Sequence, residues 1–278
     1  MNLPWPHRFF LAIIVFISPL DGVRAGPIEA TFEKADVRIP DNVVEKYGLD
    51  FRPAYDRLEA EAKNGERPNY AKARLGELAK RIPPGVKLPL IVYFHGCAGI
   101  RQASMGHLNW LAKLDDFVVM APDSFARPRP QYCFSDHTVD VSIFRPVTLM
   151  RRAEIDYALG RVVKIPWVDI RNIFLIGHSQ GGGTVAGYRG MVKIRGRIIL
   201  NGSCNPALGG DGMKDDEALL TFDTGRDPWF LNYPNTKCRE YVSRHPNGKS
   251  VYQADSATHD LVREYWPVVK AFLTENRR

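Results

Sequence analysis

The chain has 278 residues, of which 45% are hydrophobic and 25% are charged, with 23 Gly, 20 Pro and four Cys. This composition excludes a disordered, collagen-like or low-complexity protein, and the length allows one large domain with a sizeable core. The formal net charge is +7. The densest basic cluster has no interleaved aromatic residues, so we expect a solvated face and no nucleic-acid partner. It comprises Arg189, Lys193, Arg195 and Arg197.

Residues 1–25 have the three parts of a secretory signal. A short basic start precedes an apolar run at residues 9–20, and Val23-Arg24-Ala25 resembles the small-residue site at which signal peptides are cleaved. The run is shorter than the roughly 18 to 20 residues that a membrane-spanning helix needs. We predict cleavage after Ala25 and a periplasmic or secreted protein without stable membrane insertion. An uncleaved anchor is the alternative.

Export determines how the four cysteines are interpreted. Thiols pair with one another in an oxidising compartment, and the chain has no C-x-x-C spacing typical of a zinc site. We favour disulfides between Cys97 and Cys133 and between Cys204 and Cys238, since each pair lies at the ends of successive strand-to-strand connections. Buried free thiols are the alternative.

Residues 26–87 differ from the sequence that follows because they are mainly polar. Four apolar residues recur at helical spacing: Leu75, Leu78, Ala79 and Ile82. This pattern ends at Pro83-Pro84-Gly85, which breaks a helix. We expect an N-terminal helical extension packed on a core domain at residues 88–278.

Short apolar runs alternate with amphipathic stretches from residue 88 onward. The expected strands are 88–94, 117–121, 173–176, 197–200, 218–222 and 251–252. The expected helices are 102–114, 147–163, 180–188 and a last one with Leu261, Tyr265, Val269 and Phe272 on one face. This repetition predicts an α/β fold with a mostly parallel central sheet flanked by helices.

The strongest local motif is Gly177-His178-Ser179-Gln180-Gly181, which follows the strand at 173–176 and leads into a helical stretch. Glycines beside the serine are typical of a tight strand-to-helix turn, because larger side chains would collide with neighbouring backbone. Such a turn lifts the hydroxyl above the sheet edge. Ser179 is therefore the expected nucleophile, and an ordinary glycine-rich turn is the alternative.

A serine nucleophile needs a base and a group that orients that base. Of the seven histidines, only His259 lies between the last strand and the final helix, so it is the expected base. We expect the other six to be structural or solvated. The acid should follow the preceding strand, where Asp223 and Asp227 are candidates. We favour Asp227, which lies beyond the Gly225 turn in a loop that can bend toward the histidine.

Acyl transfer also needs donors for the oxyanion that develops on the substrate. The strand at 88–94 opens into the small-residue loop His95-Gly96-Cys97-Ala98-Gly99, which leaves backbone N–H groups free. We assign the oxyanion hole to the amides of Cys97 and Gln180. A disulfide from Cys97 to Cys133 would hold this loop still.

Taken in chain order, these motifs resemble the α/β-hydrolase fold, and the chain is similar to the dienelactone hydrolase-like group over about residues 88–275. The motifs are His95-Gly96-Cys97-Ala98-Gly99, Asp123-Ser124-Phe125, residues 168–173, residues 177–182, Asp227-Pro228 and His259. The resemblance implies the triad order Ser, acid, His, which Ser179, Asp227 and His259 match. Dienelactone hydrolases proper carry a cysteine nucleophile, so a serine here favours a general esterase.

We therefore expect an exported serine hydrolase that cleaves small-molecule carboxylic esters through an acyl-enzyme, without a metal or organic cofactor. Arg127 and Arg129, beside aromatic residues, and Trp229 favour a small, partly anionic or aromatic acyl group over a long lipid chain. A serine peptidase or amidase with the same triad is one alternative. A catalytically silent binding protein on a hydrolase fold is another.

Overall fold

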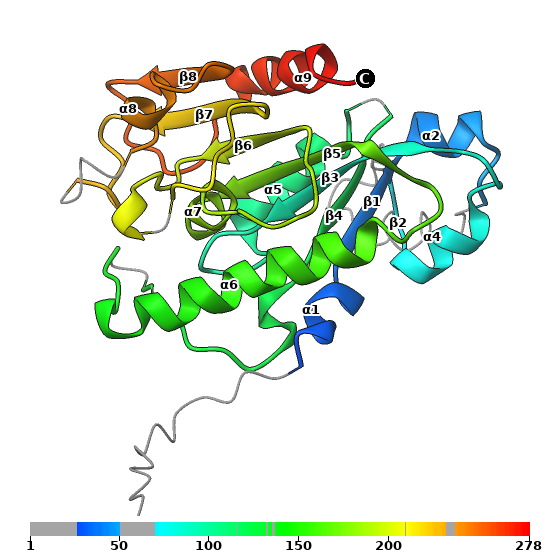
Figure 1. Cartoon of the computed structure of the whole chain (residues 1–278), viewed down its shortest axis with the longest axis horizontal. Helices are drawn as coiled ribbons and strands as arrows, with labels where there is room; N and C mark the ends of the chain where they lie inside the picture. Colours follow the sequence, from blue (N-terminus) through cyan, green and yellow to red (C-terminus); the bar gives the residue numbers. More distant parts are fainter. Residues whose placement is uncertain are drawn as a thin grey trace, which may run out of the picture.

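Strands from the described residues form an eight-stranded sheet through the centre of the protein (Figure 1). The structure is a computed structural model that describes residues 27–50, 70–114, 116–131, 133–134, 137–208, 210–231 and 237–278. The expected signal segment, residues 1–25, lies outside the described residues. The order of strands across the sheet is β2-β1-β4-β3-β5-β6-β7-β8.

The parallel part of the sheet is built from the apolar runs seen in the sequence. Its strands are β3 (Leu88–Phe94), β4 (Val118–Ala121), β5 (Val168–His178), β6 (Gly196–Leu200), β7 (Ala218–Thr224) and β8 (Gly248–Gln253). Every residue of β3, β6 and β7 is buried, as expected for parallel strands covered on both faces. The predicted α/β class and mostly parallel sheet are confirmed.

Helices cover both faces of this sheet. One face carries α6 (Val141–Val162) and α7 (Gln180–Ala186), and the other carries α5 (Gln102–Leu111) and α9 (Trp266–Glu275). Successive strand residues point to opposite faces, so the neighbours Leu90 and Ile91 on β3 pack in different apolar clusters. The core is therefore two apolar layers, one on each side of the sheet.

The N-terminal extension contributes strands as well as the helices predicted for it. Its elements are α1 (Glu29–Glu33), β1 (Asp36–Pro40), α2 (Asp41–Lys46), β2 (Tyr70–Lys72) and α4 (Leu75–Arg81). β1 is antiparallel to both β2 and β4. Val37 and Ile39 are buried, but Arg38 between them is buried as well and donates from Nε to Asp36 at 2.7 Å. A short strand that contains a charged residue shows only a weak alternation of apolar and polar residues. The strand β1 is therefore identified by its pairing with β4 and not from the sequence.

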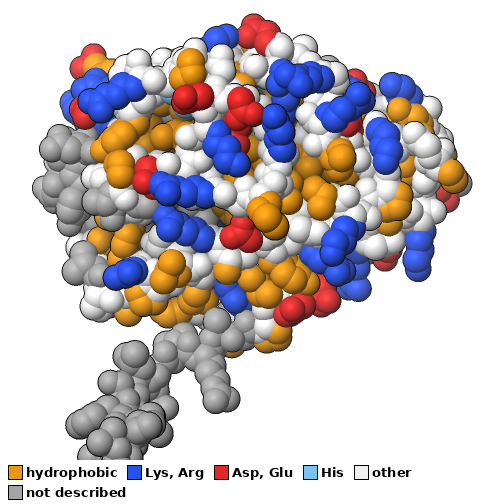
Figure 2. Space-filling model, in the orientation of Figure 1, with side chains coloured by type: hydrophobic (Ala, Val, Ile, Leu, Met, Phe, Trp, Pro, Cys, Tyr) orange, Lys and Arg blue, Asp and Glu red, His pale blue; other side chains and the backbone are white. Residues whose placement is uncertain are grey.

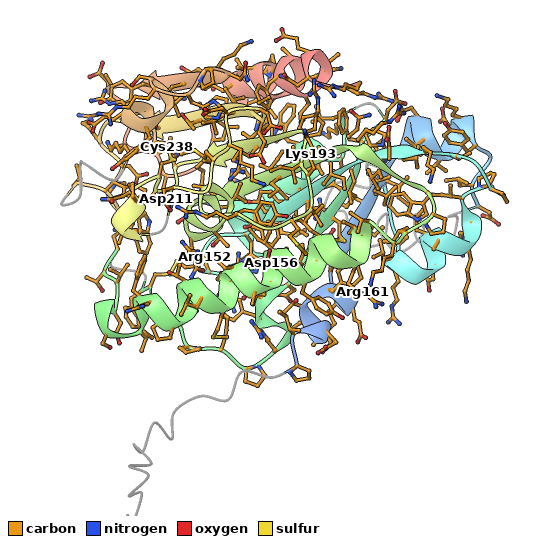
Figure 3. The ribbon with its side chains drawn as sticks, in the orientation of Figure 1. Arg152, Asp156, Arg161, Lys193, Asp211 and Cys238 are labelled. Atoms are coloured by element: carbon orange, nitrogen blue, oxygen red, sulfur yellow. A yellow bond between two sulfur atoms is a disulfide. The ribbon has the colours of Figure 1, made fainter. Side chains whose placement is uncertain are left out.

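Helix α6 begins at Val141, six residues before the start predicted from the sequence. The prediction placed the start after Pro146, but this proline lies within the helix. Asp140 caps the N-terminus, because its carboxylate accepts from the backbone N–H of Ser142 at 2.9 Å. The helix crosses the near face of the molecule, where Arg152, Asp156 and Arg161 lie along it (Figure 3).

The basic cluster is only partly the solvated face that we expected. Arg189 pairs with Asp211, and Lys193 pairs with Asp216 at 2.8 Å, all with exposed side chains. Lys and Arg side chains are scattered among acidic and apolar ones over the face in Figure 2. The expectation is wrong for Arg197, which is fully buried and is held by the Glu217 carboxylate and backbone carbonyls. A buried guanidinium is tolerated because Glu217 matches its charge and both terminal nitrogens have acceptors.

Both expected disulfides are present in the structure. Cys97 is bonded to Cys133 and Cys204 is bonded to Cys238, so none of the four cysteines is free. The first bridge ties the loop after β3 to the segment before α6, and the second ties the segment after β6 to the start of α8 (Arg239–Val242). In the described part of the chain, no helix combines the length and apolar character that crossing a membrane requires.

Candidate active site

Ser179 lies at a sharp turn between the end of β5 and the first residue of α7. Its backbone has a φ of 55° and a ψ of −119°, which is a strained conformation for a residue with a side chain. Two hydrogen bonds hold the turn. The Ser179 N–H donates to the carbonyl of Leu200 at 2.9 Å, and the Ser179 carbonyl accepts from the N–H of Gly183 at 3.1 Å.

The glycines on either side of this turn are required by close backbone approach. A Cβ atom on Gly177 would lie 2.3 Å from the carbonyl oxygen of Gly181. A Cβ atom on Gly181 would lie 1.9 Å from the carbonyl oxygen of Phe94. Both distances are far inside van der Waals contact, so the glycine spacing in the sequence reflects a steric need of this turn.

His259 and Asp227 are brought together by loops that follow β8 and β7. The His259 Nδ1 atom lies 2.6 Å from Asp227 Oδ2. Asp227 is only 1% exposed, and its other oxygen accepts from the N–H of Trp229 at 2.9 Å. A carboxylate at Nδ1 fixes the proton there and leaves the lone pair on Nε2. His259 Nε2 is buried and has no hydrogen-bond partner among the described residues, Ser179 included. In unliganded sites, catalytic hydrogen bonds often form only when substrate binds.

Asp223, the other acid that the sequence offered, lies at a different place. It is on β7, and its carboxylate accepts from the backbone N–H groups of Cys238 at 3.3 Å and Arg239 at 2.9 Å. These contacts are at the start of α8, and burial raises the pKa of Asp223 to about 6. Of the two candidates, the structure brings Asp227 and not Asp223 to His259.

Side chains on or next to the central strands hydrogen-bond to the backbone around His259. The carbonyl of His259 accepts from Nε2 of His178 and from Nδ2 of Asn201, both at 2.9 Å. The hydroxyl of Thr224 donates to the neighbouring carbonyl of Thr258 at 2.7 Å. His259 is therefore placed by contacts from β5, β7 and the segment after β6, which no local pattern in the sequence indicates.

Two of the histidines expected to be structural form a chain of ring contacts with His259: the His178 ring is tilted against that of His259, and the His107 ring is edge-on to that of His178. The ring centroids of His178 and His259 are 4.9 Å apart, and those of His107 and His178 are 4.8 Å apart. The Tyr93 hydroxyl lies 2.9 Å from His107 Nδ1. Burial lowers the pKa of His178 well below its ordinary value and that of His107 to about 4, so both rings are neutral. His178 then carries its proton on Nε2, which donates to the carbonyl of His259.

The loop after β3, which carries Cys97, is anchored by a buried ionic network. The carboxylate of Glu154 accepts from Arg127 at 2.8 Å, from Arg151 at 3.0 Å and from the Ser124 hydroxyl at 2.8 Å. Arg151 also donates to the carbonyl of His95 at 2.8 Å. Sequence reasoning missed Arg151 and Glu154, because they lie on α6 outside any motif.

Arg129 connects this loop to the residue after Ser179. Its guanidinium lies 4.0 Å from the ring centroid of Phe125 and donates to the carbonyl of Cys97 at 3.4 Å and to Gln180 Oε1 at 3.4 Å. Arg127 is committed to Glu154. Neither arginine is among the residues that line the cavity at Ser179. This differs from the expectation that these two side chains receive a partly anionic acyl group.

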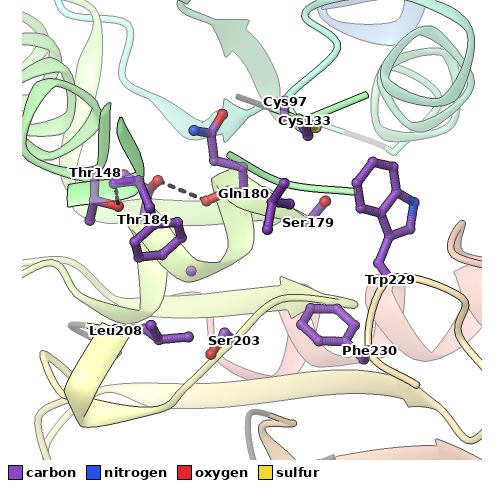
Figure 4. Close-up of a pocket in the computed structure, with 13 residues that line it drawn as sticks. Cys97, Cys133, Thr148, Ser179, Gln180, Thr184, Ser203, Leu208, Trp229 and Phe230 are labelled. Atoms are coloured by element: carbon purple, nitrogen blue, oxygen red, sulfur yellow. Dashed lines mark hydrogen bonds between the residues drawn. A yellow bond between two sulfur atoms is a disulfide. The ribbon is translucent and has the colours of Figure 1, made fainter. Parts of the chain in front are cut away.

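A cavity of about 400 Å³ opens beside Ser179 (Figure 4). The described residues that line it are uncharged: Cys97, Cys133, Val139, Phe144, Thr148, Ser179, Gln180, Gly183, Thr184, Ser203, Leu208, Trp229 and Phe230. The two residues expected to supply oxyanion donors, Cys97 and Gln180, therefore border the same space as the expected nucleophile. Across the described residues, no group of three or more His, Cys, Asp or Glu side chains is arranged to hold a metal ion.

Solved structures share this architecture. A phospholipase/carboxylesterase from Dyadobacter fermentans is 17% identical with a TM-score of 0.52, and the match covers 69% of this chain and 93% of that chain. A dienelactone hydrolase-like promiscuous phosphotriesterase from metagenomic libraries is 16% identical with a TM-score of 0.52, covering 69% and 87%. An acetyl xylan esterase from a Paenibacillus species is 18% identical with a TM-score of 0.51, covering 69% and 75%.

These similarities define the fold. The chain has the α/β-hydrolase fold, and its structural neighbours include dienelactone hydrolase-like enzymes and carboxylesterases. The resemblance seen in the sequence is thus confirmed at the level of the fold. No protein-family model and no curated protein sequence matches the chain.

Proposed function

We propose that the protein is an exported serine hydrolase that cleaves carboxylic esters with small acyl groups through an acyl-enzyme. The observation that carries the proposal is the 2.6 Å contact between His259 Nδ1 and the buried Asp227 carboxylate. It occurs on a fold that also presents Ser179 in a strained turn at an uncharged cavity. Acyl transfer requires a base oriented by a carboxylate and a serine hydroxyl that the base can reach when substrate binds.

The proposed reaction has two steps. The Ser179 hydroxyl oxygen attacks the ester carbonyl carbon while His259 Nε2 accepts the hydroxyl proton, and the amides of Cys97 and Gln180 donate to the oxyanion. The bond to the alcohol oxygen then breaks, and His259 returns the proton to that oxygen. In the second step, water attacks the acyl carbon while His259 Nε2 accepts its proton. The bond to the Ser179 oxygen then breaks, His259 returns the proton to that oxygen, and the carboxylic acid is released. Asp227 keeps the imidazole in the required tautomer throughout.

Export is supported by two features of the chain. The Cys97–Cys133 and Cys204–Cys238 disulfides fit an oxidising compartment, where such bonds form and persist. Residues 1–25 have the pattern of a cleaved secretory signal. The proposed location is therefore the periplasm or the extracellular space.

A fluorophosphonate probe tests the proposed chemistry together with turnover of p-nitrophenyl acetate. Mass spectrometry should find the probe on Ser179 alone, and labelling should parallel the loss of esterase activity. A chain that neither reacts with the probe nor hydrolyses the ester would be a binding protein on a hydrolase fold, which would overturn the proposal. Turnover of p-nitroanilide substrates above that of the matched esters would favour the amidase alternative.

A further inference from the structure

The cavity beside Ser179 has a composition that selects the substrate. We propose that it receives the acyl group of the ester and that this acyl group is uncharged and carries an aromatic ring. The inference rests on the proposed function, because only an acyl transfer reaction gives the cavity an acyl side.

The position of the cavity relative to the proposed catalytic groups identifies the acyl side. Ser179, Cys97 and Gln180 line it, so the ester carbonyl would lie at its mouth. His259 is not among the described lining residues. The leaving alcohol must take its proton from His259 Nε2, so it lies on the side of that ring. The remaining substituent of the carbonyl, the acyl chain, then points into the cavity.

The lining disfavours a charged acyl group. Its two threonine hydroxyl groups already donate within the protein: Thr148 donates to the carbonyl of Phe144 at 2.9 Å, and Thr184 donates to the carbonyl of Gln180 at 2.8 Å (Figure 4). Ser203 Oγ accepts from the N–H of Asn205 at 3.2 Å. With no charged side chain among the described lining residues, a carboxylate here would lose its hydration without gaining a counterion.

Aromatic side chains form much of the wall. Trp229 and Phe230 follow Asp227 after the intervening Pro228, and the centroids of their rings lie 5.8 Å and 6.1 Å from that of the His259 ring. Trp229 also packs edge-on against His137 at 5.1 Å. Phe144 contributes a further ring from α6. Rings at fixed positions favour a flat aryl guest in offset or edge-to-face contact over a saturated group of equal size.

The size of the cavity favours a compact guest. Its volume of about 400 Å³ lies in the lower part of the range for small-molecule pockets, which is roughly 300 to 1,000 Å³. Such a space holds a ring on a short linker, whereas a long lipid chain requires a continuous apolar groove.

A matched series of p-nitrophenyl esters tests the inference, because every member has the same leaving group. The 3-phenylpropanoate should have a kcat/KM at least about fivefold above that of the 3-cyclohexylpropanoate, which differs in ring flatness. Adding one carboxylate to the aryl ring, in the 3-(4-carboxyphenyl)propanoate, should lower kcat/KM at least about tenfold.

Two variants on the same helix locate the effect in the cavity. Phe144→Ala removes a lining ring and should reduce the kcat/KM ratio of 3-phenylpropanoate to acetate about fivefold. Leu149→Ala is the matched control, because Leu149 also lies on α6 but is 54% exposed and outside the lining. It should leave that ratio unchanged.

The outcomes separate the inference from the proposed function. Equal kcat/KM for the phenyl and cyclohexyl esters, or faster turnover of the carboxylated ester, overturns the aryl acyl inference, while Ser179-dependent hydrolysis of the acetate still supports the proposed function. Absence of turnover for every ester overturns both. The ester series uses the wild-type protein, so its result stands even if Phe144→Ala fails to fold.

Discussion

Replacing Asp227 with asparagine tests the proposed triad with little change in shape. The Asp227 carboxylate accepts from His259 Nδ1 at 2.6 Å and from the N–H of Trp229 at 2.9 Å. An asparagine can keep one acceptor oxygen for Trp229, but its amide nitrogen is a donor and faces Nδ1. The imidazole then places its proton on Nε2 and loses the lone pair that accepts the Ser179 proton.

The expected effect is large and confined to the chemical step. Loss of the correct tautomer lowers kcat by about 10³- to 10⁴-fold in a triad of this kind. At 1.36 kcal/mol for each factor of ten, this is about 4 to 5 kcal/mol of transition-state stabilisation. KM should change little, since Asp227 is only 1% exposed and is not among the residues lining the cavity.

The matched control is Asp223→Asn, the same substitution at the other buried acid on this segment. Asp223 accepts from two backbone N–H groups near α8 and makes no contact with His259, so kcat should stay within about threefold of wild type. Initial rates with p-nitrophenyl acetate and circular dichroism of each variant give the comparison. If Asp227→Asn keeps more than about a tenth of the activity, or if Asp223→Asn is the worse variant, the acid assignment is refuted.

Two predictions concern stability. Because burial raises the pKa of Asp223 to about 6 from its ordinary value of 3.8, the folded state binds this proton more tightly than the unfolded state. The stabilisation is complete below pH 3.8 and is lost as pH rises through 6, about 3 kcal/mol in all. Urea unfolding across this range should show a decline that Asp223→Asn flattens; an equal decline in the variant would contradict the assignment. The paired change Cys204→Ser with Cys238→Ser opens a loop of sequence separation 34 and should lower the free energy of unfolding by about 4 kcal/mol in the chain-entropy model. Chemical denaturation under non-reducing conditions measures this, and unchanged stability would show that the bridge constrains nothing.

The sequence by itself determined the features that depend on local sterics and local patterning. The apolar runs of β3, β6 and β7 are buried from end to end, and such runs are recognisable without knowing their neighbours. The turn at Ser179 was likewise readable, because a Cβ on Gly177 or Gly181 would collide with backbone. The cysteine pairing followed from the order of strand connections.

Only the tertiary structure decided which distant groups meet. Asp223 and Asp227 are four positions apart, and the bend of the chain after β7 sends the first to α8 and the second to His259. The strands β1 and β2 are too short and too charged to be recognised before they pair at the sheet edge. Arg127, which we expected to contact the substrate, instead donates a hydrogen bond to Glu154. Each of these contacts joins residues from separate elements, so its energy exists only after the chain has folded and cannot be read from local periodicity.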